Sequence, residues 1–290
     1  MGSLRDVKNR INSVKNTRKI TSAMRMVASA KLTKVEGVIE NMLPYQNKLD
    51  SILCKFLSGG TKVESPFTVQ REVKRIAVVV MSSNTSLCGA YNANVIRSLT
   101  SLLEEKKYLG EEAILLYPIG RKVEEFLKKN GYQTEGSFQE LAETPSYKEA
   151  RKLANILMKK FLIGEIDQVV FIYHHFKSLA SQELLKDVYL PLDIDKYRQR
   201  GDDNKVNNDY IVEPSEVELI ANLLPKVLSQ KLFTVLVDSN ASEHAARSLA
   251  MQIATDNANE LIQELTKQYN KSRQQAITNE LLDIIGGSMR

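Results

Sequence analysis

Side chains able to act as nucleophiles or metal ligands are few in this 290-residue sequence, which has two cysteines and three histidines. Cys88 has no neighbouring histidine to take its proton, so a small buried thiol is a simpler interpretation than a nucleophile. His174 and His175 are adjacent in a predicted strand and point to opposite faces, which prevents them from sharing a metal ion. His244 follows a Ser-Glu step that is typical of a helix start rather than of a ligand set. The sequence predicts no catalytic residue, cofactor or metal.

The loop at residues 82–89 (SSNTSLCG) is the best candidate for a phosphate site, because it is polar and precedes a predicted helix. However, no G-x-G-x-x-G follows Met81, and no Gly-x4-Gly-Lys-Ser/Thr occurs in the chain. Helix capping by these side chains therefore competes with anion binding. The carboxylates are scattered, and none forms a marked pair for acid–base chemistry. This pattern indicates a protein that transmits a change to its partners rather than one that catalyses a reaction.

Composition sets broad limits on the class of protein. Hydrophobic residues make up 43% of the chain and the net charge is +5. No run of about 18 apolar residues is present, so no membrane span is predicted, and the polar start lacks a secretory signal. Cys54 and Cys88 are far apart, which favours a reducing compartment without a disulfide framework.

The segment that must organise the chain is its last one, from Leu219 to Ile285. It has neither Pro nor Gly between Lys226 and Ile285, and its apolar or small residues mostly recur at helical spacing. These residues are Ala241, Ala245, Leu249, Ile253, Ala258, Leu261, Leu265, Tyr269, Ala276, Leu281 and Ile284. A helix of this length is about 90 Å long, and its apolar stripe requires a partner helix.

The partner predicted for it is a second segment, free of Pro, at residues 4–43. The predicted seam runs through Leu4, Val7, Ile11, Val14, Met24, Val27, Lys31, Val35, Val38 and Met42. Pro44 is expected to bend this helix, and Gly59-Gly60 to end it. An antiparallel coiled coil between the two ends of the chain buries both seams.

In the middle of the chain, the apolar residues recur with a different period, and short apolar runs alternate with helical patterns. Strands are predicted at 76–81, 113–119, 166–176 and 182–192, and helices at 87–107, 121–130 and 147–162. The polar stretch 193–210 is a predicted surface loop, and Ser215-Glu216 a helix start. The predicted fold class is therefore α/β, with a Rossmann-like open α/β domain at 73–195. The coiled coil is formed by an N-terminal helix at 1–58 and a C-terminal helix at 209–290.

The first helix has a lopsided charge, with Asp6 as the lone acid among nine basic residues up to Lys34. These residues either form a solvated flank or dock on an acidic partner or a phosphate backbone. A basic coiled-coil nucleic-acid-binding protein is thus one alternative. It is disfavoured because the basic residues are interleaved with the seam and no base-reading module is present. A small-molecule enzyme is a second alternative, disfavoured by the missing phosphate loop.

Five stretches, in order along the chain, closely resemble the gamma subunit of the F-type ATP synthase. They are Ile11–Leu32, Leu87–Asn94, Asp209–Pro214, Ser242–Ile262 and Tyr269–Gly287. The chain departs from the family at Asn84-Thr85-Ser86, where the family usually has an Asp or Lys-Gly step. No cysteine-bearing insertion of the chloroplast type is present, and there is no transit peptide, so the resemblance is to the bacterial type.

The resemblance implies a central rotor shaft that couples proton flow through the membrane sector to ATP synthesis or hydrolysis by rotation. Its implied partners are the alpha and beta subunits of the catalytic ring, epsilon, the c-subunit ring and, in the same complex, delta. Neither catalysis by this chain, nor a cofactor, nor nucleic acid is implied. The implied location is the cytoplasmic face of the bacterial inner membrane, with attachment only through partners.

The resemblance also assigns contact residues. Arg273 and Gln274 match positions that grip a loop of one beta subunit, and Lys19, Met24 and Arg25 lie where the acidic lever of beta is met. Tyr197 and Tyr210 belong to the region that contacts epsilon and the c ring. Taken singly, Arg273 would be an ordinary exposed helix residue and Met24 a seam residue.

Overall fold

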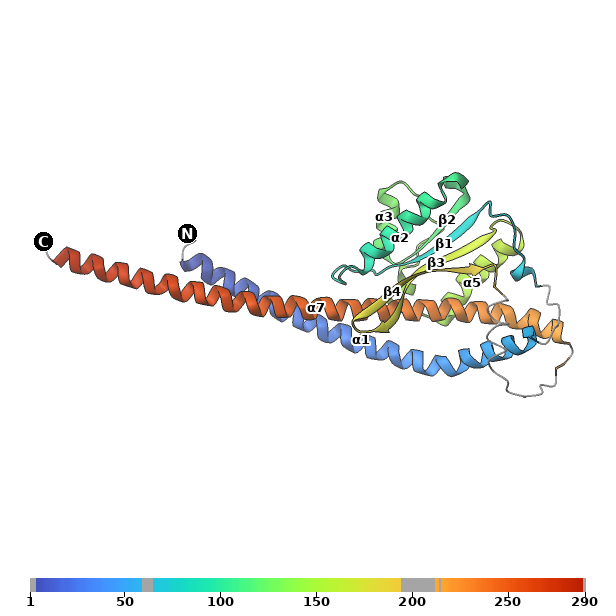
Figure 1. The fold of residues 1–290 in the computed structure, drawn as a ribbon, viewed down its shortest axis with the longest axis horizontal. Helices are drawn as coiled ribbons and strands as arrows, with labels where there is room; N and C mark the ends of the chain where they lie inside the picture. The colour runs from blue at the N-terminus through green and yellow to red at the C-terminus, as the bar shows by residue number, and fades with distance from the viewer. Residues whose placement is uncertain (1–3, 59–64, 194–211, 214, 289–290) are drawn as a thin grey trace. The chain divides into compact units, whose positions relative to one another are not determined.

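The computed structural model describes residues 4–58, 65–193, 212–213 and 215–288. Its contacts divide the chain into two compact units. One unit consists of Met1–Ala30 with Arg247–Arg290, and the other of Lys31–Ala246. The described part of the first unit is helical, whereas the second contains a sheet with helices on both faces (Figure 1).

Two helices account for nearly half of the chain. α1 runs over Leu4–Ser58 and α7 over Glu216–Ser288, with Pro44 and Pro225 inside them. The backbone N–H of Glu218 donates to Ser215 Oγ at 3.3 Å, which confirms the predicted helix start. With 73 residues, α7 is roughly 110 Å long. One 18-residue stretch within it could cross a bilayer by length and composition, but 61% of that stretch is buried in the protein, as in a core helix.

The sheet has four strands in the order β2-β1-β3-β4, namely β1 (Ile76–Met81), β2 (Ile114–Ile119), β3 (Gln168–Ser178) and β4 (Ser181–Leu190). β1 pairs in parallel with both β2 and β3, and β4 joins β3 as an antiparallel edge. Parallel strands need crossover connections, and here helices supply them. This open sheet confirms the predicted Rossmann-like class.

Helices cover both faces of the sheet. α2 (Tyr91–Glu105) and α3 (Arg121–Lys129) pack on the face formed by Ile76, Val78 and Val80. α5 (Tyr147–Leu162), the C-terminal part of α1 and the first half of α7 share a core with Ala77, Val79 and Met81. All six β1 side chains are buried because a central parallel strand has helices on both sides.

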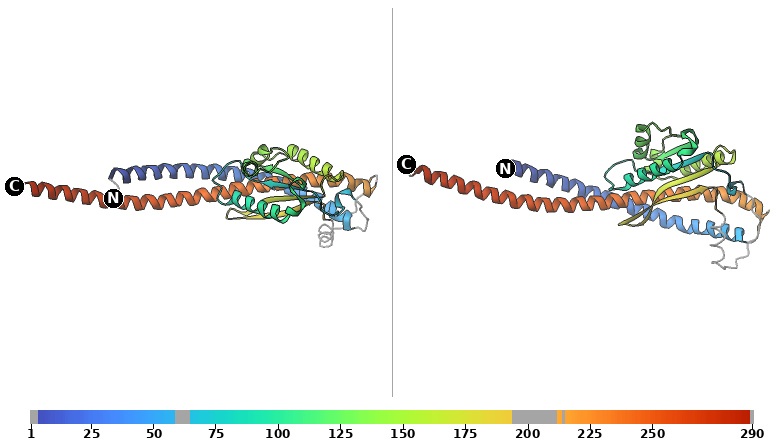
Figure 2. Two further views of the ribbon diagram at one scale, coloured as in Figure 1. Left: turned by 90° about the horizontal axis from the view of Figure 1, so that it is seen from above. Right: turned by 45° about the horizontal axis from the view of Figure 1, so that its top comes forward.

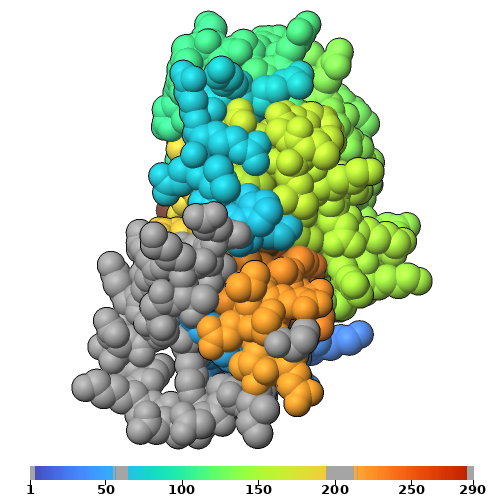
Figure 3. Space-filling view, turned by 90° about the vertical axis from the view of Figure 1, so that its right-hand side faces the viewer, coloured from blue at the N-terminus to red at the C-terminus, as the bar shows by residue number. Residues whose placement is uncertain are grey.

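The residues that lead into β1 lie on the face of the molecule seen in Figure 3, beside α5 and the start of α7. A short 3₁₀ helix, η1 (Pro66–Thr68), leads to Arg71, whose guanidinium donates to the Phe161 carbonyl at 3.1 Å. The Asp167 carboxylate then accepts the backbone N–H groups of Lys74 and Arg75 at 2.9 and 3.0 Å. These bonds fix where β1 and β3 begin.

Some element boundaries differ from the prediction. α2 begins at Tyr91 rather than Leu87, because Leu87 (φ 70°) and Gly89 (φ 60°) adopt left-handed conformations that a right-handed helix cannot include. α4 (Gln139–Glu143) was not predicted, since five residues are too few to show helical periodicity. His244 does not begin a helix; it lies inside α7, about eight turns from the helix start.

The predicted loop at 193–210 lies outside the described residues apart from its first position. The division into domains at 1–58, 73–195 and 209–290 stays a prediction.

Candidate docking surface of the helix pair

In the first unit, α1 and α7 are antiparallel (Figure 2). Polar side chains from both helices join them. As the residue number rises from 18 to 29 along α1, its partner's number falls from 259 to 248 along α7. The pairs are Arg18 Nη1 to Asn259 Oδ1 (3.1 Å), Thr21 Oγ1 with Thr255 Oγ1 (2.8 Å), Arg25 Nη1 to Gln252 Oε1, and Ser29 Oγ with Ser248 Oγ (2.9 Å). We call these four pairs the polar seam. They confirm the predicted antiparallel pairing of the two ends of the chain.

The seam predicted on α1 is confirmed at Ile11 and Met42, which are buried, but it is wrong at other positions. Val27 is 58% exposed and Val38 40%, and Lys31 is also exposed. The buried positions continue the spacing that starts at Ile11, through Thr21, Ala28, Leu32, Met42 and Leu49. The spacing of apolar residues alone does not show which face of α1 contacts α7, because Arg18, Thr21 and Arg25 on that face are polar. The heptad spacing of these three residues could have indicated it.

The seam predicted on α7 also needs a correction. Ala241, Ala245, Ala258 and Leu265 are buried as predicted, but Ile253 is 52% exposed. Gln252 and Thr255 occupy the facing positions on either side of Ile253. Here again, the side chains that face the other helix are polar, so the spacing of apolar residues does not reveal them.

The predicted contact residues on α1 differ in what they offer to a partner. Lys19 is exposed, whereas Met24 is half-buried, and the guanidinium of Arg25 binds Gln252 within the pair. Lys19 is one of a set of exposed basic residues that form no ion pair with the residues the structure describes: Arg5, Lys8, Arg10, Lys15 and Lys19. Arg25 therefore contributes to the pair itself, as Arg18 does, whereas these five basic side chains are exposed.

Arg273 and Gln274 are both exposed on the far part of α7. The helix beyond them is apolar and open to solvent, with exposed fractions between 48% and 68%. This segment, which we call the apolar end of α7, comprises Ile277, Leu281, Leu282, Ile284 and Ile285. Exposed apolar patches of this kind mark surfaces that contact other proteins. Tyr197 and Tyr210, the other predicted contact residues, lie outside the described part of the chain.

The polar loop at 82–89 is occupied by bonds within the protein. Val123 N–H donates to Ser82 Oγ at 3.1 Å, and Arg121 N–H donates to Asn84 Oδ1 at 3.0 Å. The loop therefore caps α3, as the capping interpretation required, although the helix it caps is not the one that follows it. Cys88 is buried, as predicted, and its sulfur accepts a hydrogen bond from Asn92 Nδ2 at 3.1 Å.

The carboxyl edge of the sheet, where open α/β sheets bind nucleotides, is filled by α7. Tyr91 OH donates to the Ser239 carbonyl at 3.1 Å, and Asn240 Nδ2 donates to the Ala142 carbonyl at 2.7 Å. The cavity left between these groups has a volume of about 10 Å³, too small for a nucleotide. The sheet therefore uses its usual ligand edge to hold a helix.

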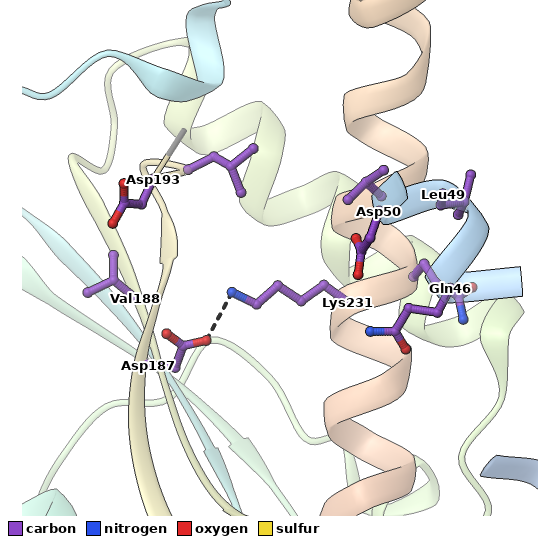
Figure 4. Close-up of a pocket in the computed structure, with 10 residues that line it drawn as sticks. Gln46, Leu49, Asp50, Asp187, Val188, Asp193 and Lys231 are labelled. Atoms are coloured by element: carbon purple, nitrogen blue, oxygen red, sulfur yellow. Dashed lines mark ion pairs between the residues drawn. The ribbon is translucent and has the colours of Figure 1, made fainter. Parts of the chain in front are cut away.

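A larger cavity of about 250 Å³ lies between α1, β4 and α7 (Figure 4). Lys231 extends across it from α7, and its Nζ lies 2.9 Å from Asp187 Oδ2 on β4. Gln46 lines the cavity from α1, and its Oε1 accepts a hydrogen bond from Thr234 at 2.9 Å. Among the described residues, no group of three or more His, Cys, Asp or Glu side chains could hold a metal ion. The cavity is polar and suits water molecules.

A family model described as ATP synthase matches residues 3–289. The ATP synthase gamma chain of Bacteroides fragilis is 63% identical over the whole of both chains. The chain belongs to the ATP synthase gamma-chain family. The gamma chain of Flavobacterium johnsoniae is 40% identical, with 99% of this chain and 98% of that chain covered.

Solved structures agree on the fold. The central stalk and c-ring structure of the Tetrahymena thermophila mitochondrial ATP synthase contains a chain that is 25% identical, with a TM-score of 0.60. It matches 81% of this chain and 99% of that chain. A chain of the Euglena gracilis mitochondrial ATP synthase is 18% identical with a TM-score of 0.66, covering 99% of this chain and 93% of that chain, and supports the fold alone.

Proposed function

We propose that the chain is the central rotor shaft of a bacterial ATP synthase and that it transmits rotation without catalysing a reaction. The observation that carries this proposal is the antiparallel pairing of its two ends in a chain that matches the gamma-chain family over its full length. The filled carboxyl edge of the sheet supports a structural use of the α/β domain. The nucleic-acid-binding alternative has no support from the relatives.

The proposed mechanism is mechanical coupling. As the shaft turns, it presents different faces to three otherwise equivalent catalytic sites, and each site prefers the conformation that best contacts the face it meets. A partner is shifted only by a difference in contact free energy between its states. Moving an equilibrium from 1:99 to 99:1 needs about 5.5 kcal/mol. Several charge-assisted contacts with apolar packing provide free energy of this order.

The proposed partners follow from the surfaces described above. The exposed basic residues of α1 suit acidic loops of beta, and the apolar end of α7 suits an apolar sleeve in the ring of alpha and beta subunits. Epsilon and the c ring are proposed to bind near Tyr197 and Tyr210, and delta belongs to the same complex. These partners would hold the chain at the cytoplasmic face of the inner membrane.

Co-expression with the alpha and beta subunits of the same source tests the proposal. We expect this chain to co-purify at one copy for three alpha–beta pairs, and the complex to hydrolyse ATP while the chain alone does not. ATP turnover by the purified chain, or a failure to join the ring, would contradict the rotor function. The contacts proposed near Tyr197 and Tyr210 are tested by cross-linking. We expect cross-links between residues 195–212 and the epsilon or c subunits.

The grip on beta is tested by changing Arg273 and Gln274 together to alanine. Both side chains are exposed, so we expect the fold and assembly to be preserved while coupled turnover falls several-fold. The matched control changes Lys267 and Gln268 to alanine, an exposed basic–amide pair on the same helix. Equal turnover in the wild-type complex and the Arg273/Gln274 variant would remove these residues from the mechanism.

A further inference from the structure

An unusual buried histidine lies where β3, α2 and α7 meet in the second unit. His174 is 2% exposed, and its ring stacks on Tyr91 with the ring centroids 4.4 Å apart. Its Nδ1 has no hydrogen-bond partner among the residues the structure describes. A buried polar atom without a partner is costly, and such atoms are uncommon in native proteins.

The same place is where α7 is fastened to the sheet. Ser242 Oγ of α7 donates to the His174 carbonyl at 3.0 Å, and Tyr91 OH donates to the Ser239 carbonyl of α7 at 3.1 Å. Tyr91 thus contacts His174 with its ring and α7 with its hydroxyl group. We call His174, Tyr91, Ser239 and Ser242 the clasp.

Charged and titratable groups face the clasp from each neighbouring element. On β3, His175 Nδ1 lies 2.6 Å from Asp238 Oδ2 of α7, and Phe176 N–H donates to Asp238 Oδ1 at 2.8 Å. Cys88 lies before α2. On α7, Glu243 Oε1 and His244 Nδ1 are 4.0 Å apart, and on the β3–β4 hairpin Lys177 Nζ lies 2.6 Å from Glu183 Oε2.

Protonation of His174 would place a charge in this dry contact. Burial lowers the pKa of His174 to about 4, because the folded protein cannot solvate the imidazolium. An imidazole exposed to water has a pKa of about 6.5. Acidification between these values therefore favours any state in which the clasp is open.

We propose that the clasp is an acid-sensitive fastening, in which protonation of His174 releases α7 from β3 and α2. This device goes beyond the rotor function, because it makes the connection between the sheet and the long helix depend on pH. From the two pKa values of His174 alone, we expect the population with an open clasp to be about tenfold higher at pH 5.5 than at pH 8.

Asp238 acts in the opposite direction. Burial raises its pKa, while the bonds from Phe176 and His175 lower it, and the balance is a raised pKa. The folded carboxyl group therefore takes up a proton more readily than an exposed one, which favours the closed state in acid. A test must separate His174 from this group.

Cys88 is a natural reporter of opening, because it is buried and its carbonyl accepts the Tyr91 N–H at 3.3 Å. In a full-length Cys54→Ala background, the reaction of Cys88 with 4,4′-dithiodipyridine is measured from pH 8 to pH 5 relative to a model thiol. We expect the relative rate to rise by pH 5.5, by at most about tenfold because Asp238 opposes the effect of His174. In His174→Phe, which retains an aromatic ring for stacking, we expect this rise to disappear. An equal rise in both proteins would overturn the proposal.

A second measurement does not depend on whether the phenylalanine variant folds. In the full chain with His175→Gln and His244→Gln, the remaining imidazole signals of His174 are followed by NMR as the pH falls. We expect His174 to stay neutral in the folded chain until close to pH 4, with signals of an open, protonated form increasing below pH 6.5. Protonation near pH 6.5 without any opening would contradict the proposal.

Discussion

Gly120 shows how a single residue holds the carboxyl edge of the sheet together. Its φ is +98°, in the left-handed region, and a Cβ atom placed on it would lie 2.1 Å from the Ser82 carbonyl oxygen. Only glycine allows the chain leaving β2 to approach the loop after β1 this closely. The hydrogen bonds that join the loop to α3 depend on this approach.

Gly120→Ala is therefore expected to lower the free energy of unfolding by about 3 kcal/mol, since it adds both backbone strain and a steric overlap. Gly131→Ala is the matched control, because Gly131 also has a positive φ, +80°, but no atom lies within 4 Å of its added Cβ. We expect the control to cost about 1 kcal/mol. Thermal or urea unfolding measures both, and equal losses would show that the close approach is unimportant.

At the residue scale, burial was easier to predict than partners. Cys88 is buried and His174 and His175 point to opposite faces, as their residue types and strand positions predicted. The stacking of His174 on Tyr91 joins residues more than eighty positions apart. No spacing rule relates such positions, because their contact arises only when α2 packs on the sheet.

At the scale of elements, the two long helices were predictable because they lack backbone breakers over long stretches. Their register was not, since it depends on which polar residues face each other. The Oγ1 atoms of Thr21 and Thr255 lie 2.8 Å apart, and each also lies within hydrogen-bond distance of a backbone carbonyl of its own helix, Arg18 at 3.1 Å and Met251 at 2.7 Å. The two hydroxyl hydrogens thus always have an acceptor among these groups. Threonine can thus occupy a seam without leaving a buried polar atom unpaired.

Replacing Thr21 and Thr255 together by valine is expected to stabilise the helix pair by about 1 kcal/mol. Both hydroxyl groups are removed, so no unpaired donor remains, and two methyl groups of similar volume are buried. Thr17→Val is the control, because Thr17 makes the same backbone bond, to Ser13 at 3.1 Å, on an exposed position. Amide hydrogen exchange over residues 18–28 reports the change; slower exchange in the control alone would contradict the expectation.

For the whole molecule, the two ends of α7 have different roles. Its first half is part of the core of the second unit, while the apolar end has large exposed side chains such as Leu282 and Ile284. A surface of this kind is tolerated when a partner covers it, and in the free chain it promotes self-association.

A chain that ends at Asn279 is therefore expected to keep its unfolding temperature within about 2 °C, since the exposed residues removed contribute little to stability. Its tendency to self-associate should fall, which sedimentation velocity at increasing concentration measures. A full-length variant with Leu282→Ser and Ile284→Ser keeps the helix length and serves as the comparison. A large loss of thermal stability in the shortened chain would show that the segment packs within the molecule.

In the first unit, the polar seam sets which residue of α7 faces which residue of α1. Inserting one residue into α7 after Thr255 would rotate every later side chain by about 100° about the helix axis. Asn259 would then no longer face Arg18. The direction in which the far part of α7 presents Arg273 and Gln274 is thus set by the number of amino acids between them and the polar seam.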